Sequence, residues 1–182
     1  WIDHPSNLQL DTHNYCNLWL DPGCTGCIYC NVKPSAGWEL PRGYMSSNMI
    51  EDLIEYWGPK GMKSVAPYID GEPGMDPRLP WICDIAKEQG MYVVIDTNGA
   101  VLDLKDYKLY EDLLENDQIL DDRDDVSNVR ENIIHPNMKE VRFSFSANSP
   151  DVYKINHGGP YFDRVTKHIE YFLENKHENQ IA

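Results

Sequence analysis

The sequence predicts an α/β domain built on an open, parallel sheet. Short apolar segments typical of strands alternate with amphipathic segments typical of helices along most of the chain. Strands that alternate with helices form parallel sheets with right-handed crossovers. About four βα units are recognisable in the 182 residues, fewer than a closed barrel needs. We therefore expect a partial TIM-type barrel, that is, an open and curved parallel (βα) sheet.

Four segments are predicted to be strands. In chain order they are 8–13, 64–69, 92–95 and 141–146. The first alternates apolar and polar residues, as a strand with one buried face does. The third, Tyr92 to Ile95, is apolar and rich in β-branched residues, which is typical of a strand covered on both faces.

Helices are predicted between and after these strands. Ser46 or Ser47 is expected to cap the first one, and Gly58 to end it. Asp76 is expected to cap the second, with Pro77 in its first turn and Gly90 at its end. The apolar residues expected on the buried faces of the first and last helices are Met49, Ile50, Leu53, Ile54 and Trp57, and Phe162, Val165, Ile169, Phe172 and Leu173. A further helix is expected at 104–114, an acidic loop or irregular insertion at 115–130, and a frayed end at 175–182.

Composition narrows the range of partners. Thirty acidic residues against sixteen basic ones give a formal net charge of −14, which disfavours binding to nucleic acid. No apolar run is long enough to cross a membrane, and the first residues do not form a signal peptide, so we expect a cytoplasmic protein. We interpret residues 1–182 as one domain that is trimmed at Trp1 and continues beyond Ala182.

Cysteine is the most informative residue type. Four of the five cysteines, Cys16, Cys24, Cys27 and Cys30, lie within fifteen residues, whereas Cys83 stands alone on a predicted apolar helix face. Tight clustering and an odd total favour a metal site over a disulfide framework. Thiolates are soft ligands that suit zinc or an iron–sulfur cluster. Four could close a structural zinc site, whereas three on a cluster would leave one iron open.

Polar and glycine-rich residues follow the first three predicted strands and end the fourth. In chain order they are the four clustered cysteines, then Gly71, Glu72 and Pro73, then Thr97, Asn98 and Gly99, and last Ser144 and Ser146. The carboxyl ends of parallel strands meet at one edge of the sheet, where ligands bind in such folds. We therefore expect these residues to share one rim.

This combination resembles the radical S-adenosylmethionine (SAM) superfamily over about Leu8 to Leu173. The residues around Cys16 look like the first-cysteine segment of that family, and Cys27-Ile28-Tyr29-Cys30 looks like its closing Cys-x-aromatic-Cys. Gly71-Glu72-Pro73 matches a Gly-Glu-Pro motif whose backbone holds the amino group of SAM. A glycine there lets the backbone approach a ligand closely.

The resemblance also covers the later strands. Thr97-Asn98-Gly99 recurs after the third strand of many members, and the fourth strand with Ser144 and Ser146 is similar to one that supplies a serine for the ribose or carboxylate of SAM. His157 stands where many members have an arginine that pairs with this carboxylate. Because a neutral imidazole donates only one hydrogen bond, it is a weaker substitute for a guanidinium.

The cysteine spacing departs from the family pattern. The usual arrangement is Cys-x3-Cys-x2-Cys, but ten residues separate Cys16 from Cys27 here, with Cys24 between them. Cys27 and Cys30 match the final pair, so the third ligand is either Cys16 or Cys24. We favour Cys16, because it directly follows the first strand, and because the cost of closing a longer loop grows slowly with its length.

The resemblance implies a [4Fe–4S] cluster and SAM as cofactors, and reductive cleavage of SAM that starts radical chemistry on a small-molecule or peptide substrate. It also implies an electron donor such as flavodoxin or ferredoxin. Two alternatives remain open at this point. One is an activase that makes a glycyl radical on a partner protein, and the other is a non-catalytic zinc or iron–sulfur module.

Overall fold

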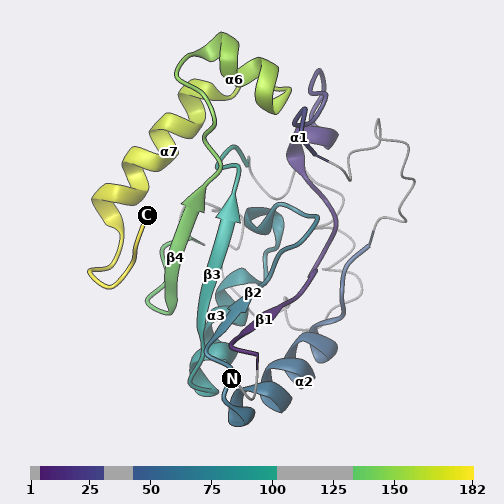
Figure 1. Ribbon diagram of the computed structural model, residues 1–182, viewed down its shortest axis with the longest axis vertical. Helices are drawn as coiled ribbons and strands as arrows, with labels where there is room; N and C mark the ends of the chain where they lie inside the picture. Colours follow the sequence, from purple (N-terminus) through teal and green to yellow (C-terminus); the bar gives the residue numbers. More distant parts are fainter. Residues whose placement is uncertain (1–4, 31–42, 102–132) are drawn as a thin grey trace.

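The computed structural model describes residues 5–30, 43–101 and 133–182. The helix expected at 104–114 and the acidic segment expected at 115–130 lie outside these ranges. The described part is an α/β structure with a single sheet, drawn in Figure 1. None of its helices is long and apolar enough to cross a membrane.

The sheet has four parallel strands in the order β1-β2-β3-β4. Their bounds are Asn7–Gln9 for β1, Ser64–Ala66 for β2, Tyr92–Thr97 for β3 and Met138–Phe143 for β4. Apolar residues align across the centre of the sheet, where Val65 lies opposite Val93 and Ile95 opposite Val141. The parallel, sequential order confirms the predicted open (βα) sheet.

All four strands differ from their predicted bounds, and β3 continues to Thr97, two residues beyond its predicted end. After Leu10, whose amide still bonds to Ala66 of β2, the carbonyl of Thr12 accepts from Met45 and from the guanidinium of Arg78. The first strand therefore ends at Gln9 instead of residue 13. β2 ends at Ala66 instead of residue 69. β4 begins at Met138, earlier than expected, and ends at Phe143, because a tight turn follows in which Phe145 donates to the carbonyl of Phe143.

One apolar core joins the sheet to helices α2 (Ser47–Trp57), α3 (Leu79–Glu88) and α7 (Phe162–Asn175). Residues from all three helices are fully buried in it, among them Ile54, Ile82 and Phe172. Cys83 is also buried there, as the sequence predicts. Met49 and Leu173 are about half exposed, at 52% and 51%, so their placement on the buried faces was wrong.

Capping distinguishes the two helices α2 and α3. Ser46 caps α2, since its hydroxyl accepts from the amide of Met49. The predicted cap of α3 is wrong, because that helix begins at Leu79 and Asp76 instead binds Arg78. Gly90 follows α3 with a left-handed φ of 71°, as expected of a glycine that ends a helix. The short 3-10 helices η2 (Gly58–Lys60) and η3 (Pro73–Met75) follow α2 and β2.

The C-terminal segment is not frayed as expected. Ile181 pairs with the outer edge of β4, because its amide donates to Lys139 and its carbonyl accepts from Val141. Gln180 is buried, and its side chain donates to the carbonyl of Ile133. These contacts cover part of a strand edge that would otherwise present unpaired backbone groups.

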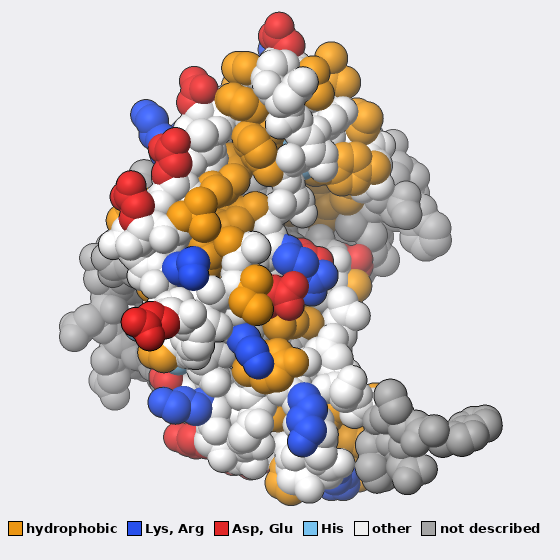
Figure 2. Space-filling view, turned by 60° about the vertical axis from the view of Figure 1, so that its left-hand side comes forward, with side chains coloured by type: hydrophobic (Ala, Val, Ile, Leu, Met, Phe, Trp, Pro, Cys, Tyr) orange, Lys and Arg blue, Asp and Glu red, His pale blue; other side chains and the backbone are white. Residues whose placement is uncertain are grey.

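Helices α1 (Asn17–Leu20) and α6 (Pro150–His157) lie beyond the end of the sheet to which the strand arrows point in Figure 1. This is the carboxyl end of the strands. Figure 2 brings the side of β4 and α7 forward and shows acidic and basic side chains interspersed among apolar ones on that face.

Arg78 is the largest fully buried charged side chain among the described residues. It pairs with Asp76 at 2.9 Å and donates to the carbonyls of Met45 and Thr12. The pair lowers the pKa of Asp76 to about 2, against the opposing effect of its burial. Arg78 thereby links the loop after β1, the start of α2 and the loop after β2.

We expect Arg78→Met to lower the free energy of unfolding by about 3–5 kcal/mol, because it leaves the Asp76 carboxylate buried without its counter-charge. Urea denaturation followed by circular dichroism measures the change. The control is Arg142→Met, since Arg142 is 53% exposed and its pairs with Asp96 and Glu140 lie at the surface. That variant should lose less than about 1 kcal/mol. Equal losses in the two variants would contradict the structural role given to Arg78.

Candidate functional site

The segment from Cys16 to Cys30, here called the cysteine loop, contains all four clustered cysteines. Its first part is fixed against the end of β3. Cys16 precedes α1, and its carbonyl accepts from the amides of Trp19 and Leu20. The side-chain amide of Asn98 donates to the Oδ1 atom of Asn17 at 2.8 Å and lies 3.7 Å from the Cys16 Sγ atom. The first predicted ligand and the residues after β3 therefore meet, as the sequence predicts for loops at one rim.

The second part of the loop is fixed against the C-terminus of α6. The amide of Thr25 donates to the carbonyl of Gly158, and the amide of Ile28 donates to the carbonyl of Asn156, both at 2.9 Å. These two bonds lie on either side of Cys27. Gly158 permits the approach, because a Cβ atom there would lie 2.3 Å from the carbonyl oxygen of Gly26.

Three of the four thiols share one electrostatic environment. Burial raises the pKa of Cys16 well above its ordinary value, and the neighbouring Glu72, Cys27 and Cys30 raise it further. Burial also raises the pKa of Cys27, with a contribution from Cys30. Negative charge on Cys16 and Cys27 is therefore unfavourable in the absence of a bound cation.

Cys24 has different neighbours. Its thiol donates to the hydroxyl of Tyr161 at 3.6 Å, and that hydroxyl donates to Asp21 at 2.7 Å. A Cβ atom on Gly159 would lie 2.8 Å from the Cys24 sulfur, so this thiol packs against the connection between α6 and α7. Within the described ranges, no three His, Cys, Asp or Glu side chains come together as ligands of a single metal ion.

Glu72 is buried and joins two of the predicted rim segments. Its carboxylate accepts from the amide of Gly74 at 3.0 Å, from the hydroxyl of Thr97 at 2.5 Å and from the amide of Asn98 at 2.7 Å. Burial raises the pKa of Glu72 to about 7, although these donors act in the opposite direction. The side chains of Glu72 and Thr97 are therefore used within the protein and hold the loop after β2 to the end of β3.

Gly71 is required by packing within the protein. A Cβ atom at this position would lie 2.2 Å from the carbonyl oxygen of His13 and 2.8 Å from its ring. The adjacent amide of Glu72 donates to the carbonyl of Tyr15. The missing side chain thus lets the loop after β2 approach the start of the cysteine loop, a contact that the sequence alone did not indicate.

The residues after β4 complete the rim. Ser144 and Ser146 are exposed, and the Ser144 amide donates to the carbonyl of Thr97, which ties this segment to β3. Tyr29 is 54% exposed. His157 is instead fully buried, with its ring nitrogens near Cys27, Tyr29 and the amide of Ser146. Both of its nitrogens have partners inside the protein.

Some residues of the site were missed in the sequence. Asn17 and Tyr161 hold the loop through their side chains, and Tyr153 stacks on His157 with ring centroids 4.4 Å apart. Asn17 gave a weak signal, since it is a polar residue that precedes the apolar Leu18-Trp19-Leu20. Nothing in the sequence indicated a role for the two tyrosines. Tyr161 bonds to residues more than a hundred positions away, and Tyr153 lies on a helix face of ordinary composition.

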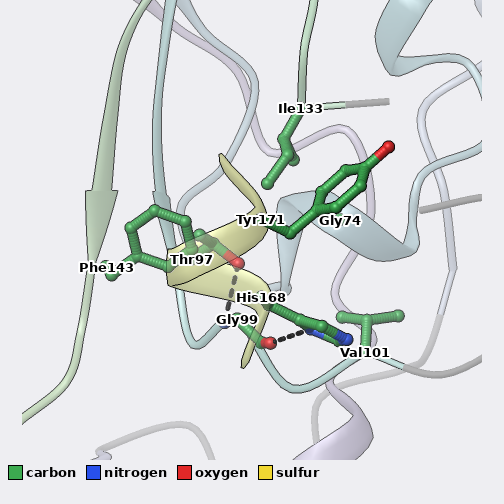
Figure 3. Close-up of a pocket in the computed structure, with 8 residues that line it drawn as sticks. All are labelled: Gly74, Thr97, Gly99, Val101, Ile133, Phe143, His168 and Tyr171. Atoms are coloured by element: carbon green, nitrogen blue, oxygen red, sulfur yellow. Dashed lines mark hydrogen bonds between the residues drawn. The ribbon is translucent and has the colours of Figure 1, made fainter. Parts of the chain in front are cut away.

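A small pocket lies beneath the rim, and Figure 3 shows its lining. His168 and Tyr171 of α7 face the end of β3 there, with the His168 ring bonded to the carbonyl of Gly99 and the Thr97 hydroxyl accepting from the Gly99 amide. Its volume of about 20 Å³ has room for about one water molecule. The pocket therefore belongs to the packing under the site and is too small for a substrate.

We expect Gly158→Ala to destabilise the protein and displace the cysteine loop. Gly158 has a left-handed φ of 73°, and the added methyl group would also overlap Gly26. The control is Gly61→Ala, since Gly61 has a φ of 96° with nothing within 4 Å of a Cβ atom. Gly61→Ala should cost roughly 1–2 kcal/mol from its φ alone, and Gly158→Ala an additional ~1–3 kcal/mol from overpacking. Equal losses in urea denaturation would show that the contact with Gly26 is unimportant.

No family model matches the sequence, and no curated protein matches it. Solved structures with a similar fold include methylornithine synthase (PylB), with 15% identity, a TM-score of 0.54 and coverage of 94% of this chain and 42% of that one. BtrN in complex with AdoMet and 2-DOIA has 20% identity, a TM-score of 0.46 and coverage of 61% and 43%. TYW1 with a lysine-pyruvate adduct bound has 15% identity, a TM-score of 0.45 and coverage of 93% and 50%.

The chain thus spans half or less of the length of each of these structures. The likeness to methylornithine synthase extends over nearly the whole chain. The chain therefore has the α/β fold of methylornithine synthase over the part of that structure that it covers.

Proposed function

We propose that the protein is a radical SAM enzyme that binds a [4Fe–4S] cluster and SAM at the rim formed by the carboxyl ends of its strands. The observation that carries this proposal is the physical connection of the segments that resemble the family motifs. Cys16 lies next to Asn98, Glu72 binds Thr97 and the Asn98 amide, and the segment around Cys27 is bonded to the end of α6.

Cys16, Cys27 and Cys30 are the residues that would hold the cluster. Their thiols influence one another electrostatically, whereas Cys24 is engaged by Tyr161. Three thiolates suit a cluster that keeps one iron open, and ligands of a cluster bind different irons, so they need not meet as the ligands of a single ion do. The donor set therefore fits the cluster, and a zinc site closed by all four cysteines is disfavoured by the position of Cys24.

SAM would bind beside the cluster along the loop Gly71 to Pro73 and the exposed Ser144 and Ser146. The loop after β2 is held rigidly by the Glu72 carboxylate, so its backbone groups have fixed positions for a ligand. Thr97 and Asn98 position this loop and Cys16 through their own hydrogen bonds. When bound, a reduced cluster and SAM supply the chemistry, in which one electron cleaves a C–S bond of SAM and starts radical reactions on the substrate.

The partners follow from this proposal. The substrate would be a small molecule or a peptide, and a reduced protein such as flavodoxin or ferredoxin would supply the electron. The formal net charge of −14 is the reason to expect no nucleic-acid partner.

We expect the anaerobically reconstituted protein to contain iron and sulfide and to form 5′-deoxyadenosine from SAM when a strong reductant is added. Iron and sulfide are measured chemically, and 5′-deoxyadenosine by liquid chromatography. Reaction mixtures without reductant are the control and should yield none. Stoichiometric zinc without sulfide, together with no 5′-deoxyadenosine, would contradict the proposal and favour a zinc module.

Single cysteine variants test which thiols bind the cluster. We expect Cys16→Ala, Cys27→Ala and Cys30→Ala to retain less than about a quarter of the iron, because each removes a cluster ligand. Cys24→Ala should retain its iron, since this thiol contacts Tyr161. The matched control is Cys83→Ala, because Cys83 is buried in the core away from the loop. Iron lost in Cys24→Ala and retained in Cys16→Ala would overturn the assignment.

A further inference from the structure

His157 is held rigidly beneath the cysteine loop. It is the last residue of α6, its side chain is fully buried, and its ring stacks on Tyr153 at an interplanar angle of 24°. The amides of Thr25 and Ile28 are bonded to the backbone on either side of it. The imidazole and the cysteine loop therefore have a fixed relative position.

The partners of the imidazole determine its tautomer. The backbone amide of Ser146 lies 3.3 Å from the Nε2 atom of His157. Because an amide N–H can only donate, Nε2 must accept and carries no proton. An imidazole whose Nε2 atom accepts has only one N–H group, so its proton lies on Nδ1.

The protonated nitrogen faces the predicted cluster ligand. The Nδ1 atom of His157 lies 3.5 Å from the Sγ atom of Cys27 and 3.2 Å from the hydroxyl of Tyr29. The Tyr29 ring meets the imidazole edge-on, with centroids 5.8 Å apart. Tyr29 in turn forms a side-chain hydrogen bond with Cys27. His157 and Tyr29 thus form a pair of donors around a single sulfur.

We infer that His157 is a positioning residue for the cluster, and that its Nδ1–H group donates a hydrogen bond to the Cys27 thiolate and raises the reduction potential of the cluster. This inference rests on the proposed function. It assigns His157 a role inside the protein, in place of the contact with SAM that the resemblance implies for this position.

The physical basis is the charge that the cluster gains on reduction. A donor to a ligand sulfur withdraws electron density from it, and the interaction strengthens as the cluster becomes more negative. Hydrogen bonds to the sulfurs are among the properties that set the reduction potential of iron–sulfur clusters. Groups that bond to metal ligands also fix the orientation of those ligands. The bond from Ser146 to Nε2 keeps the proton on the side of the ring that faces Cys27.

The test compares His157→Phe and His157→Asn with the unaltered protein. Each protein is reconstituted and its cluster is titrated anaerobically without SAM. Electron paramagnetic resonance measures the fraction of the cluster that is reduced. Phe keeps a ring in the site but has no donor, whereas the Asn side-chain amide can place an N–H group near the position of Nδ1. We expect His157→Phe to lower the equilibrium constant for one-electron reduction about tenfold, equivalent to about 59 mV. His157→Asn should recover part of this loss.

The control is His135→Phe. His135 pairs with Asp84 of α3, and it precedes β4 at the end of the strand opposite the site. This variant should leave the potential unchanged. Equal potentials in the unaltered protein and in His157→Phe, with equal iron content, would overturn the inference and leave the proposed function intact. A protein that assembles no cluster in any form would overturn both.

A measurement on the unaltered protein without cluster covers the case in which His157→Phe does not fold. Nitrogen-15 NMR of the histidine-labelled protein distinguishes the two tautomers of the imidazole. The proton is expected on Nδ1 of His157. A proton on Nε2 would leave Cys27 without this donor and would overturn the inference.

Discussion

The arrangement of the rim depends on one buried carboxylate. Glu72 accepts hydrogen bonds from Gly74, Thr97 and Asn98, while its amide donates to the carbonyl of Tyr15. Segments that follow β1, β2 and β3 are therefore joined at one residue. Desolvation acts against the charge, as the pKa of about 7 indicates, and three converging donors compensate for it in part. The site is thus ordered by polar contacts whose partners are far apart in sequence.

The sequence was sufficient where structure depends on neighbouring residues. β3 was predicted because Val93, Val94 and Ile95 are apolar and β-branched and are buried in the sheet. The end of α3 was predicted because Gly90 readily adopts a positive φ. The parallel order of the strands followed from their alternation with helices. The residues that meet at the rim could also be predicted, since a parallel sheet brings the carboxyl ends of its strands together.

The sequence was insufficient where a group has a distant partner. The first strand ends early because the carbonyl of Thr12 bonds to Met45 and Arg78, and no local pattern contains that information. Nor does any local pattern predict that Ile181 pairs with β4, because the residues before it are polar and lack the alternation of a strand. At the site, the sequence indicated that His157 lies near the rim, but its burial and its contact with Cys27 depend on how α6 docks against the cysteine loop.

The two backbone bonds from the cysteine loop to α6 have a consequence for how such a loop can change during evolution. Thr25 and Ile28 are fixed on either side of Cys27 through main-chain atoms, independently of their side chains. Cys16 is fixed separately, against Asn98. The interval between these anchors, which includes α1, can therefore lengthen or shorten by insertion and deletion while both ends remain in place. The number of residues between Cys16 and Cys27 is therefore a poor guide to whether the two cysteines can meet.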